Sequence, residues 1–82
     1  MERWIVRAEQ IDSKTAEEVS LMADSATTAL HFAGVSPVSY DRDLMWIVRV
    51  RKGGTRKFVA TVTVSGGDAS EAFRTAEQML KG

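Results

Sequence analysis

The chain of 82 residues contains no cysteine, one proline and one histidine. Without cysteine it can form neither a disulfide nor a thiolate metal site, and one imidazole does not make a metal site by itself. No apolar stretch approaches the roughly 20 residues that cross a bilayer, and the first residues do not have the pattern of a signal peptide. These absences predict a cytoplasmic protein with no metal, no cofactor and no membrane contact.

A catalytic constellation is also missing from the sequence. No nucleophile, base and orienting group occur in a pattern of known mechanism. The run Gly53-Gly54-Thr55 lacks the lysine and the following helix of a phosphate loop. We therefore expect no enzymatic activity. The remaining alternative is a small enzyme or ligand carrier whose cleft forms only in an oligomer.

Charge is balanced over the whole chain but not along it. The 11 Lys and Arg residues offset the 11 Asp and Glu residues, which argues against a protein that coats polyanions in general. Yet residues 44–67 contain no acid, and a basic group gathers around Gly53-Gly54 within this window: Arg49, Arg51, Lys52, Arg56 and Lys57. A segregated basic segment of this kind indicates a surface that faces anions.

Two segments of the chain share the run Trp-Ile-Val-Arg. They are residues 3–7 and 45–49, and both are rich in the β-branched and aromatic residues that fit a half-buried strand. We expect two strands in similar environments, with Trp4 and Trp46 in the core. Phe58 is expected to join them there, because exposing these rings as a stacking platform for unpaired bases would bury basic side chains under the helices.

Helical spacing follows the first of these strands. Thr15 and Glu18 have the spacing of a capping box, and Gly34 is suited to the left-handed conformation that ends a helix. Between them lies an apolar stripe at helical spacing, made of Val19, Met22, Ala23, Ala26, Leu30 and Ala33. The pattern predicts a helix over residues 15–34. A second capping box, Asp68 with Glu71, predicts another helix near the C-terminal end.

The basic window predicts a β-hairpin that turns at Gly53-Gly54. A three-residue loop places Arg49 opposite Lys57, whereas a two-residue loop places Arg49 opposite Phe58. The three-residue loop is preferred, because a slip of one residue turns every side chain of a strand to the wrong face.

These elements predict one α+β domain over residues 1–82, with the order β-α-β-β-α and two helices on one face of a small antiparallel sheet. The order is that of a ferredoxin-like fold without its last strand. It leaves residues 3–8 as an open edge, which invites pairing with another chain. A rival order, α-β-β-β-α, makes residues 35–40 a strand and leaves the N-terminal run peripheral. Double-stranded-RNA-binding folds share this rival order.

The expected function is that of a small non-enzymatic binding or adaptor module. Its working surface is the open sheet face with the hairpin, and its partner is anionic, either nucleic acid or an acidic protein. The residues expected to carry this surface are Arg7, Arg49, Arg51, Lys52, Arg56 and Lys57. The alternative interpretation of the same charges is a solvated outer face that limits aggregation of a strand-rich hairpin.

The alternative function is homodimerisation through protein–protein contacts. In the expected helix, Leu21 and Phe32 lie at the ends of a second stripe that faces away from the core, and Ile5 lies on the open sheet face. Leu21, Phe32 and Ile5 are therefore candidate interface residues, together with the strand edge at residues 3–8. Alternatively, the connection after the helix folds back over Leu21 and Phe32, in which case they are not free to meet a partner.

Overall fold

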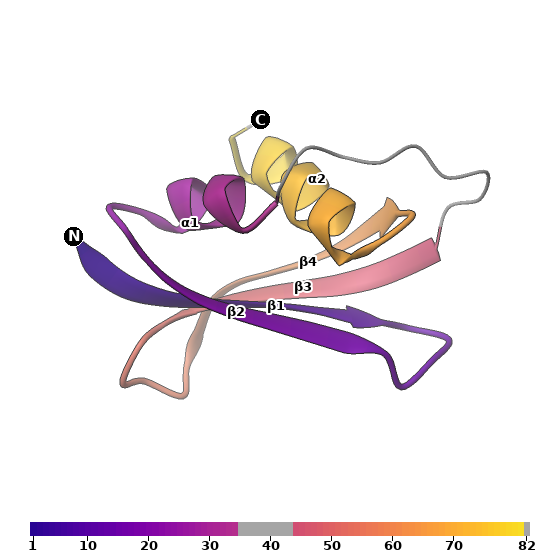
Figure 1. Cartoon of the computed structure of the whole chain (residues 1–82), viewed down its shortest axis with the longest axis horizontal. Coiled ribbons are helices and arrows are strands. Elements are labelled where there is room, and N and C mark those ends of the chain that lie inside the picture. Colours follow the sequence, from indigo (N-terminus) through magenta and orange to yellow (C-terminus); the bar gives the residue numbers. More distant parts are fainter. Residues whose placement is uncertain (35–43, 82) are drawn as a thin grey trace.

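A computed structural model describes residues 1–34 and 44–81 of the chain. The described residues form the elements β1 (Glu2–Gln10), β2 (Ala16–Ala23), α1 (Ala26–Ala33), β3 (Leu44–Lys52), β4 (Phe58–Gly66) and α2 (Ala69–Lys81). The strands make an antiparallel sheet in the order β2-β1-β3-β4. Both helices cover the same face of this sheet, and no described segment covers the other face (Figure 1).

The α+β class and the two helices on an antiparallel sheet agree with the prediction, but the element order is β-β-α-β-β-α. The predicted order β-α-β-β-α lacks β2, so the truncated ferredoxin-like order is wrong. The rival order α-β-β-β-α is also wrong, because β1 lies inside the sheet; its proposed strand at residues 35–40 falls outside the described residues. The predicted open edge at residues 3–8 is wrong for the same reason, since Ile5 pairs with Ser20 on one side and Arg51 on the other.

Strand β2 occupies the segment that was predicted to begin a helix. Val19, Leu21 and Ala23 face the core, while the residues between them are exposed, which is the period of a strand. Thr15, the expected helix cap, lies in the β1–β2 turn, where its backbone N–H donates to Ser13 Oγ at 3.1 Å. The apolar residues of this segment fit both a helical and a strand period, and pairing with β1 decides for the strand.

Each helix begins at a side-chain cap. Ser25 Oγ accepts a hydrogen bond of 3.2 Å from the backbone N–H of Thr28 and begins α1, so the predicted cap at Thr15 is wrong. Asp68 Oδ1 accepts a hydrogen bond of 2.8 Å from the backbone N–H of Glu71 and begins α2, as predicted. Such caps satisfy backbone donors that have no partner within the helix.

The core lies between the helices and the inward face of the sheet. Trp4 and Trp46 are buried there, as predicted. Each indole N–H donates to a backbone carbonyl, Trp4 to Ala23 at 3.1 Å and Trp46 to Gly66 at 2.8 Å. The other buried apolar side chains, many of them small enough to let the helices approach the sheet closely, are Val6, Ala8, Ala23, Ala29, Leu30, Ala33, Val48, Val50, Val64, Ala69, Ala72, Phe73 and Ala76.

Strands β3 and β4 pair in a register that differs from both predicted ones. Arg49 lies opposite Thr61, and not opposite Lys57 or Phe58. The predicted loops are too short, because β3 ends at residue 52 and β4 begins only at residue 58. Gly54 lies within this loop at a φ of 84°, a left-handed conformation that suits glycine.

The longer loop changes the place of Phe58. A register shift beside Arg51 sets Phe58 opposite that arginine, and the ring is 44% exposed. The prediction that Phe58 lies in the core is therefore wrong. Val62, and not Phe58, lies opposite Val48, and Val64, which is 3% exposed, lies opposite Trp46.

The fold consists of two β-β-α halves that are related by an approximate two-fold axis. The central strands β1 and β3 run antiparallel with Arg7 opposite Arg49, and β2 and β4 form the two edges. The shared Trp-Ile-Val-Arg run falls on these central strands, and each tryptophan bonds the last carbonyl of the strand that follows it. The prediction of two similar strand environments is thus confirmed.

Candidate anion-binding surface

The sheet face that the helices leave open carries the alternate side chains of each strand. At its centre Arg7 of β1 lies directly opposite Arg49 of β3. Ile5 and Ile47, both half-buried, lie on the same face to either side of this pair. Like charges directly opposite one another destabilise a sheet, so these arginines need acidic partners close by.

Glutamates of β1 and β2 supply these partners. Arg7 Nη1 lies 3.3 Å from Glu18 Oε2, and Arg51 Nη2 lies 3.7 Å from Glu18 Oε1. Arg49 Nη1 lies 3.1 Å from Glu9 Oε2. The middle of the open face is therefore a network of alternating charge and not a uniformly positive surface.

Lys52 is also paired, since its Nζ lies 3.3 Å from Glu2 Oε2. Sequence reasoning missed Glu2, Glu9 and Glu18 as members of this surface, because an acid-free window along the chain does not show which strands lie beside it. The predicted helix over residues 15–34 also removed Glu18 from the sheet. Exposed ion pairs of this kind contribute about 1 kcal/mol or less each, so they constrain the arginines only weakly.

The end of the β3–β4 hairpin is the part of the predicted surface where positive charge is not offset. Neither Arg56 nor Lys57 forms an ion pair with another described residue. The loop is braced, because Arg51 Nη1 donates to the Thr55 carbonyl at 2.7 Å and the Gly53 N–H donates to a β1 carbonyl at 2.9 Å. This loop lies well away from the two helices, at the end of the sheet opposite the β1–β2 turn (Figure 1).

A shallow pocket of about 500 Å³ lies beside the braced loop. The Phe58 ring in it is 44% exposed, and Val59 is 56% exposed. Arg49 Cζ lies 5.7 Å from the centroid of the Phe58 ring, at cation–π distance. An aromatic residue, an apolar residue and two lysines thus line one depression. Its lining residues are Lys52, Thr55, Lys57, Phe58 and Val59.

The equivalent position in the first half of the chain does not have this aromatic ring. In the β1–β2 hairpin Glu9 lies opposite Ala16, and in the β3–β4 hairpin Arg51 lies opposite Phe58. The two pairs are related by the approximate two-fold axis. The first pair consists of a glutamate and an alanine, whereas the second consists of an arginine and a phenylalanine. The exposed phenylalanine is therefore specific to the second hairpin.

The three candidate interface residues do not form one surface. Leu21 lies on β2 and packs on the core, whereas Phe32 lies on α1, is 59% exposed and meets the His31 ring edge-on. The predicted second helical stripe is wrong, because its two apolar ends belong to different elements. Ile5 lies on the open face, apart from both.

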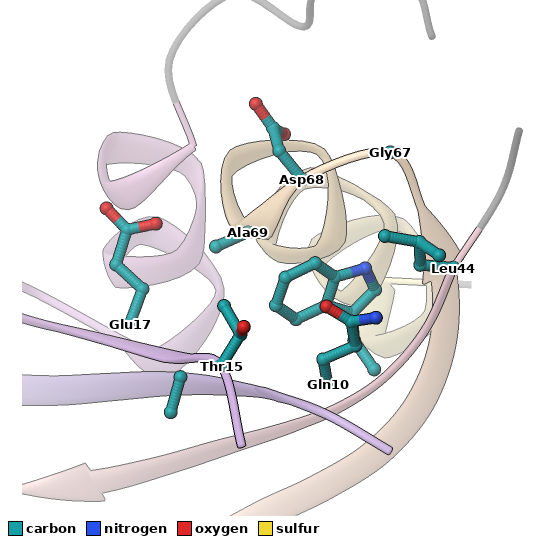
Figure 2. Close-up of a pocket in the computed structure, with 9 residues that line it drawn as sticks. Gln10, Thr15, Glu17, Leu44, Gly67, Asp68 and Ala69 are labelled. Atoms are coloured by element: carbon teal, nitrogen blue, oxygen red, sulfur yellow. The ribbon is translucent and has the colours of Figure 1, made fainter. Parts of the chain in front are cut away.

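A second pocket, of about 350 Å³, lies between the β1–β2 turn and the start of α2 (Figure 2). Two acidic residues, Glu17 and Asp68, are among the residues that line it, and no basic side chain of the described residues does so. Negative charge of this kind disfavours an anion at the beginning of α2. Its lining residues are Gln10, Thr15, Ala16, Glu17, Leu44, Trp46, Gly67, Asp68 and Ala69.

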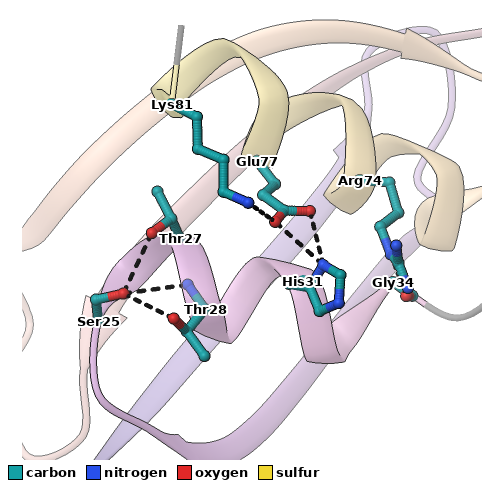
Figure 3. Close-up of polar contacts among 8 residues, drawn as sticks. All are labelled: Ser25, Thr27, Thr28, His31, Gly34, Arg74, Glu77 and Lys81. Carbon is teal, nitrogen blue, oxygen red and sulfur yellow. Dashed lines mark hydrogen bonds and ion pairs between the residues drawn. The ribbon is translucent and has the colours of Figure 1, made fainter.

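A polar cluster joins α1 and α2 (Figure 3). The helices lie on one face of the sheet, away from the β3–β4 loop (Figure 1). The buried Glu77 carboxylate lies 3.1 Å from His31 Nδ1 and 2.7 Å from Lys81 Nζ. Burial alone would raise the pKa of Glu77, but hydrogen bonds from Lys81 and His31, with their charges, outweigh it and hold the pKa below its ordinary value. The three groups are engaged with one another and link α1 to α2.

Within residues 1–34 and 44–81, no helix is both long and apolar enough to cross a membrane. The same residues include no group of three or more His, Asp or Glu side chains placed to hold a metal ion. No protein-family model, curated protein or solved structure matches this chain.

Proposed function

We propose that this chain is a non-enzymatic binding module that holds single-stranded nucleic acid at the end of the β3–β4 hairpin. The observation that carries the proposal is the exposed Phe58 ring beside Lys57, at a position where the other half of the fold has Ala16. Proteins hold unpaired bases by stacking them on exposed aromatic rings while cations meet the phosphates. A duplex offers no free base face, so these features favour a single strand.

The pattern of ion pairs supports a short contact. Phosphates that reach Arg56 and Lys57 have no protein carboxylate to displace among the described residues, whereas phosphates at Arg7 or Arg49 compete with Glu18 or Glu9. We therefore expect about two phosphates to be neutralised. For a single strand, this corresponds to a slope of about −1.4 when the logarithm of affinity is plotted against the logarithm of salt concentration.

The test is a fluorescence titration of the protein with a short labelled oligothymidylate over a series of salt concentrations. Phe58→Ala should weaken binding about fivefold or more, because stacking of a base on an aromatic ring contributes about 1–3 kcal/mol. The matched control is Phe32→Ala, which removes another strongly exposed phenylalanine, on α1 and away from the basic loop. This control should bind as tightly as the parent.

A second comparison separates nucleic acid from an acidic protein. Arg56→Ala with Lys57→Ala should weaken oligonucleotide binding and flatten its salt dependence, while Lys14→Ala in the opposite turn should do neither. Polyglutamate should bind more weakly than the oligonucleotide. If polyglutamate binds equally well and Phe58→Ala changes nothing, the partner is an acidic protein and the nucleic-acid proposal fails.

A further inference from the structure

The outer edge of β4 lacks the features that protect edge strands. Strand Phe58–Gly66 lies at one end of the sheet, and no described strand pairs with its outer side. Charged residues and proline keep edge strands from pairing with other chains. Strand β4 contains neither. Its central run alternates threonine and valine, which have high β propensity. An edge of this composition is a template for another strand.

The opposite edge, β2, carries charge. Glu17 and Glu18 are exposed on it, and charged side chains on an edge strand disfavour pairing with another chain. Glu18 lies opposite Arg7, whereas the equivalent residue of β4 is the uncharged Thr61, opposite Arg49. Charge therefore disfavours self-pairing at β2 and does not disfavour it at β4.

We propose that β4 pairs antiparallel with β4 of a second copy of this chain, so that the sheets of the two copies become continuous. A pairing of identical strands about a two-fold axis closes after two copies, whereas β2 on β4 would continue into a filament. The register shift beside Arg51 disturbs the first residues of β4 and leaves residues 60–66 regular. Pairing centred on Thr63 uses this whole regular segment, and each Thr63 then faces its own counterpart.

The side chains match on both faces in this register. On the helix side, Val62 of each copy faces Val64 of the other, and the half-buried Val62 loses solvent contact. On the open side, Thr61 faces Ser65, and hydroxyl pairs of this kind are favourable across strands. No charge of either strand faces another. The occupant that fits this uncharged edge is thus a second copy.

The oligomeric state tests this pairing without nucleic acid, so its outcome is independent of the proposed function. Sedimentation equilibrium of the parent chain should show a concentration-dependent mass that reaches twice the 9.0 kDa of the monomer. Thr63→Lys should raise the dimer dissociation constant several-fold, since it sets two lysines opposite each other. A monomer at every concentration overturns the proposal.

The matched control is Ser20→Lys at the equivalent position of the other edge. Ser20 faces Ile5 as Thr63 faces Ile47, and both are exposed. The control should dimerise like the parent. Equal loss of the dimer in both variants, or loss only in Ser20→Lys, overturns the choice of β4.

Single introduced cysteines test the register directly, because the chain has none of its own. Disulfides form only where Cβ atoms come close, so Thr63→Cys should cross-link into a dimer faster than either Thr61→Cys or Ser20→Cys. Fastest cross-linking of Thr61→Cys overturns the register centred on Thr63. Fastest cross-linking of Ser20→Cys overturns pairing through β4, even if a lysine variant fails to fold.

Discussion

His31 of α1 and Glu77 of α2 connect the two helices through a contact of 3.1 Å between Nδ1 and the carboxylate. The carboxylate is buried and accepts only, so Nδ1 is the donor. Lys81 Nζ reaches the same carboxylate at 2.7 Å. A buried charge is stable in a protein only when donors surround it in this way, so the helices are held together by charge as well as by packing.

Acid should destabilise the fold through Glu77. Burial works to raise the pKa of Glu77, yet the hydrogen bonds and charges of Lys81 and His31 bring it below its ordinary value of 4.5. A pKa lower in the folded than in the unfolded state adds stability above the unfolded value, and this stability is lost as pH falls through the folded value. As pH falls below 4.5, the free energy of unfolding should therefore decrease more steeply for the parent than for Glu77→Gln.

Urea denaturation followed by circular dichroism at each pH measures this difference. Glu17→Gln, which removes an exposed carboxylate on β2, is the control and should keep the acid dependence of the parent. An unchanged acid dependence in Glu77→Gln would show that the buried carboxylate does not set the response to pH.

The two aromatic residues Trp46 and Phe58 should differ sharply in their effect on stability. Trp46 is 3% exposed and donates to Gly66, so Trp46→Ala should lower the free energy of unfolding by roughly 3–5 kcal/mol. Phe58 is 44% exposed, so Phe58→Ala should cost about 1 kcal/mol or less. Urea denaturation followed by circular dichroism gives both values. Similar losses in the two variants would contradict the exposed position of Phe58.

Glutamates on the open face should weaken nucleic-acid binding. The double change Glu9→Gln with Glu18→Gln frees the guanidinium groups that they pair, and it should tighten oligonucleotide binding and steepen its salt dependence. Asp12→Asn with Glu17→Gln removes the same charge at exposed positions that pair with no described residue, and it should have a smaller effect. Equal tightening in both double variants would mean that net charge alone sets the affinity.

Gly54 should tolerate asparagine better than alanine. Its φ of 84° is left-handed, and a Cβ there would meet nothing within 4 Å, so any loss is conformational and not steric. Gly54→Ala should lower the free energy of unfolding by about 1 kcal/mol, and Gly54→Asn by less, because asparagine enters the left-handed region more readily. Thermal melts of the two variants measure the difference. A larger loss in Gly54→Asn would contradict this conformational account.

Local signals in the sequence predicted the parts of the fold that depend on neighbours along the chain. Asp68 and Glu71 stand next to the stripe that they introduce, so the start of α2 follows from one segment. The repeated run around Trp4 and Trp46 likewise indicated two buried strands. Burial of each tryptophan follows from alternation within its own strand.

Strand pairing limited the rest of the prediction. Val19, Leu21 and Ala23 alternate like a strand, but Thr15 and Glu18 imitate a helix start, and only contact with β1 settles the choice. The same contact brings Glu18 to Arg7 and Arg51 and so reduces the charge of the predicted anion surface.

The position of Phe58 depended on the loop before it. Its exposure follows from a loop longer than the glycine pair suggested and from the register shift beside Arg51. Neither feature is visible in the alternation of β4 itself, which places residue 58 on the core side.

The approximate two-fold arrangement also determines how the molecule opens. Each hairpin closes between strands that are neighbours in sequence, whereas β1 and β3 pair only after a complete half of the chain has intervened. Separating the halves therefore breaks the whole ladder between β1 and β3. In the monomer, amide protons of β1 and β3 should exchange with solvent through that global event, while those at the outer sides of β2 and β4 should exchange through local fluctuations. Hydrogen-exchange rates of the monomer should thus decrease from both edges of the sheet toward the Arg7–Arg49 pair.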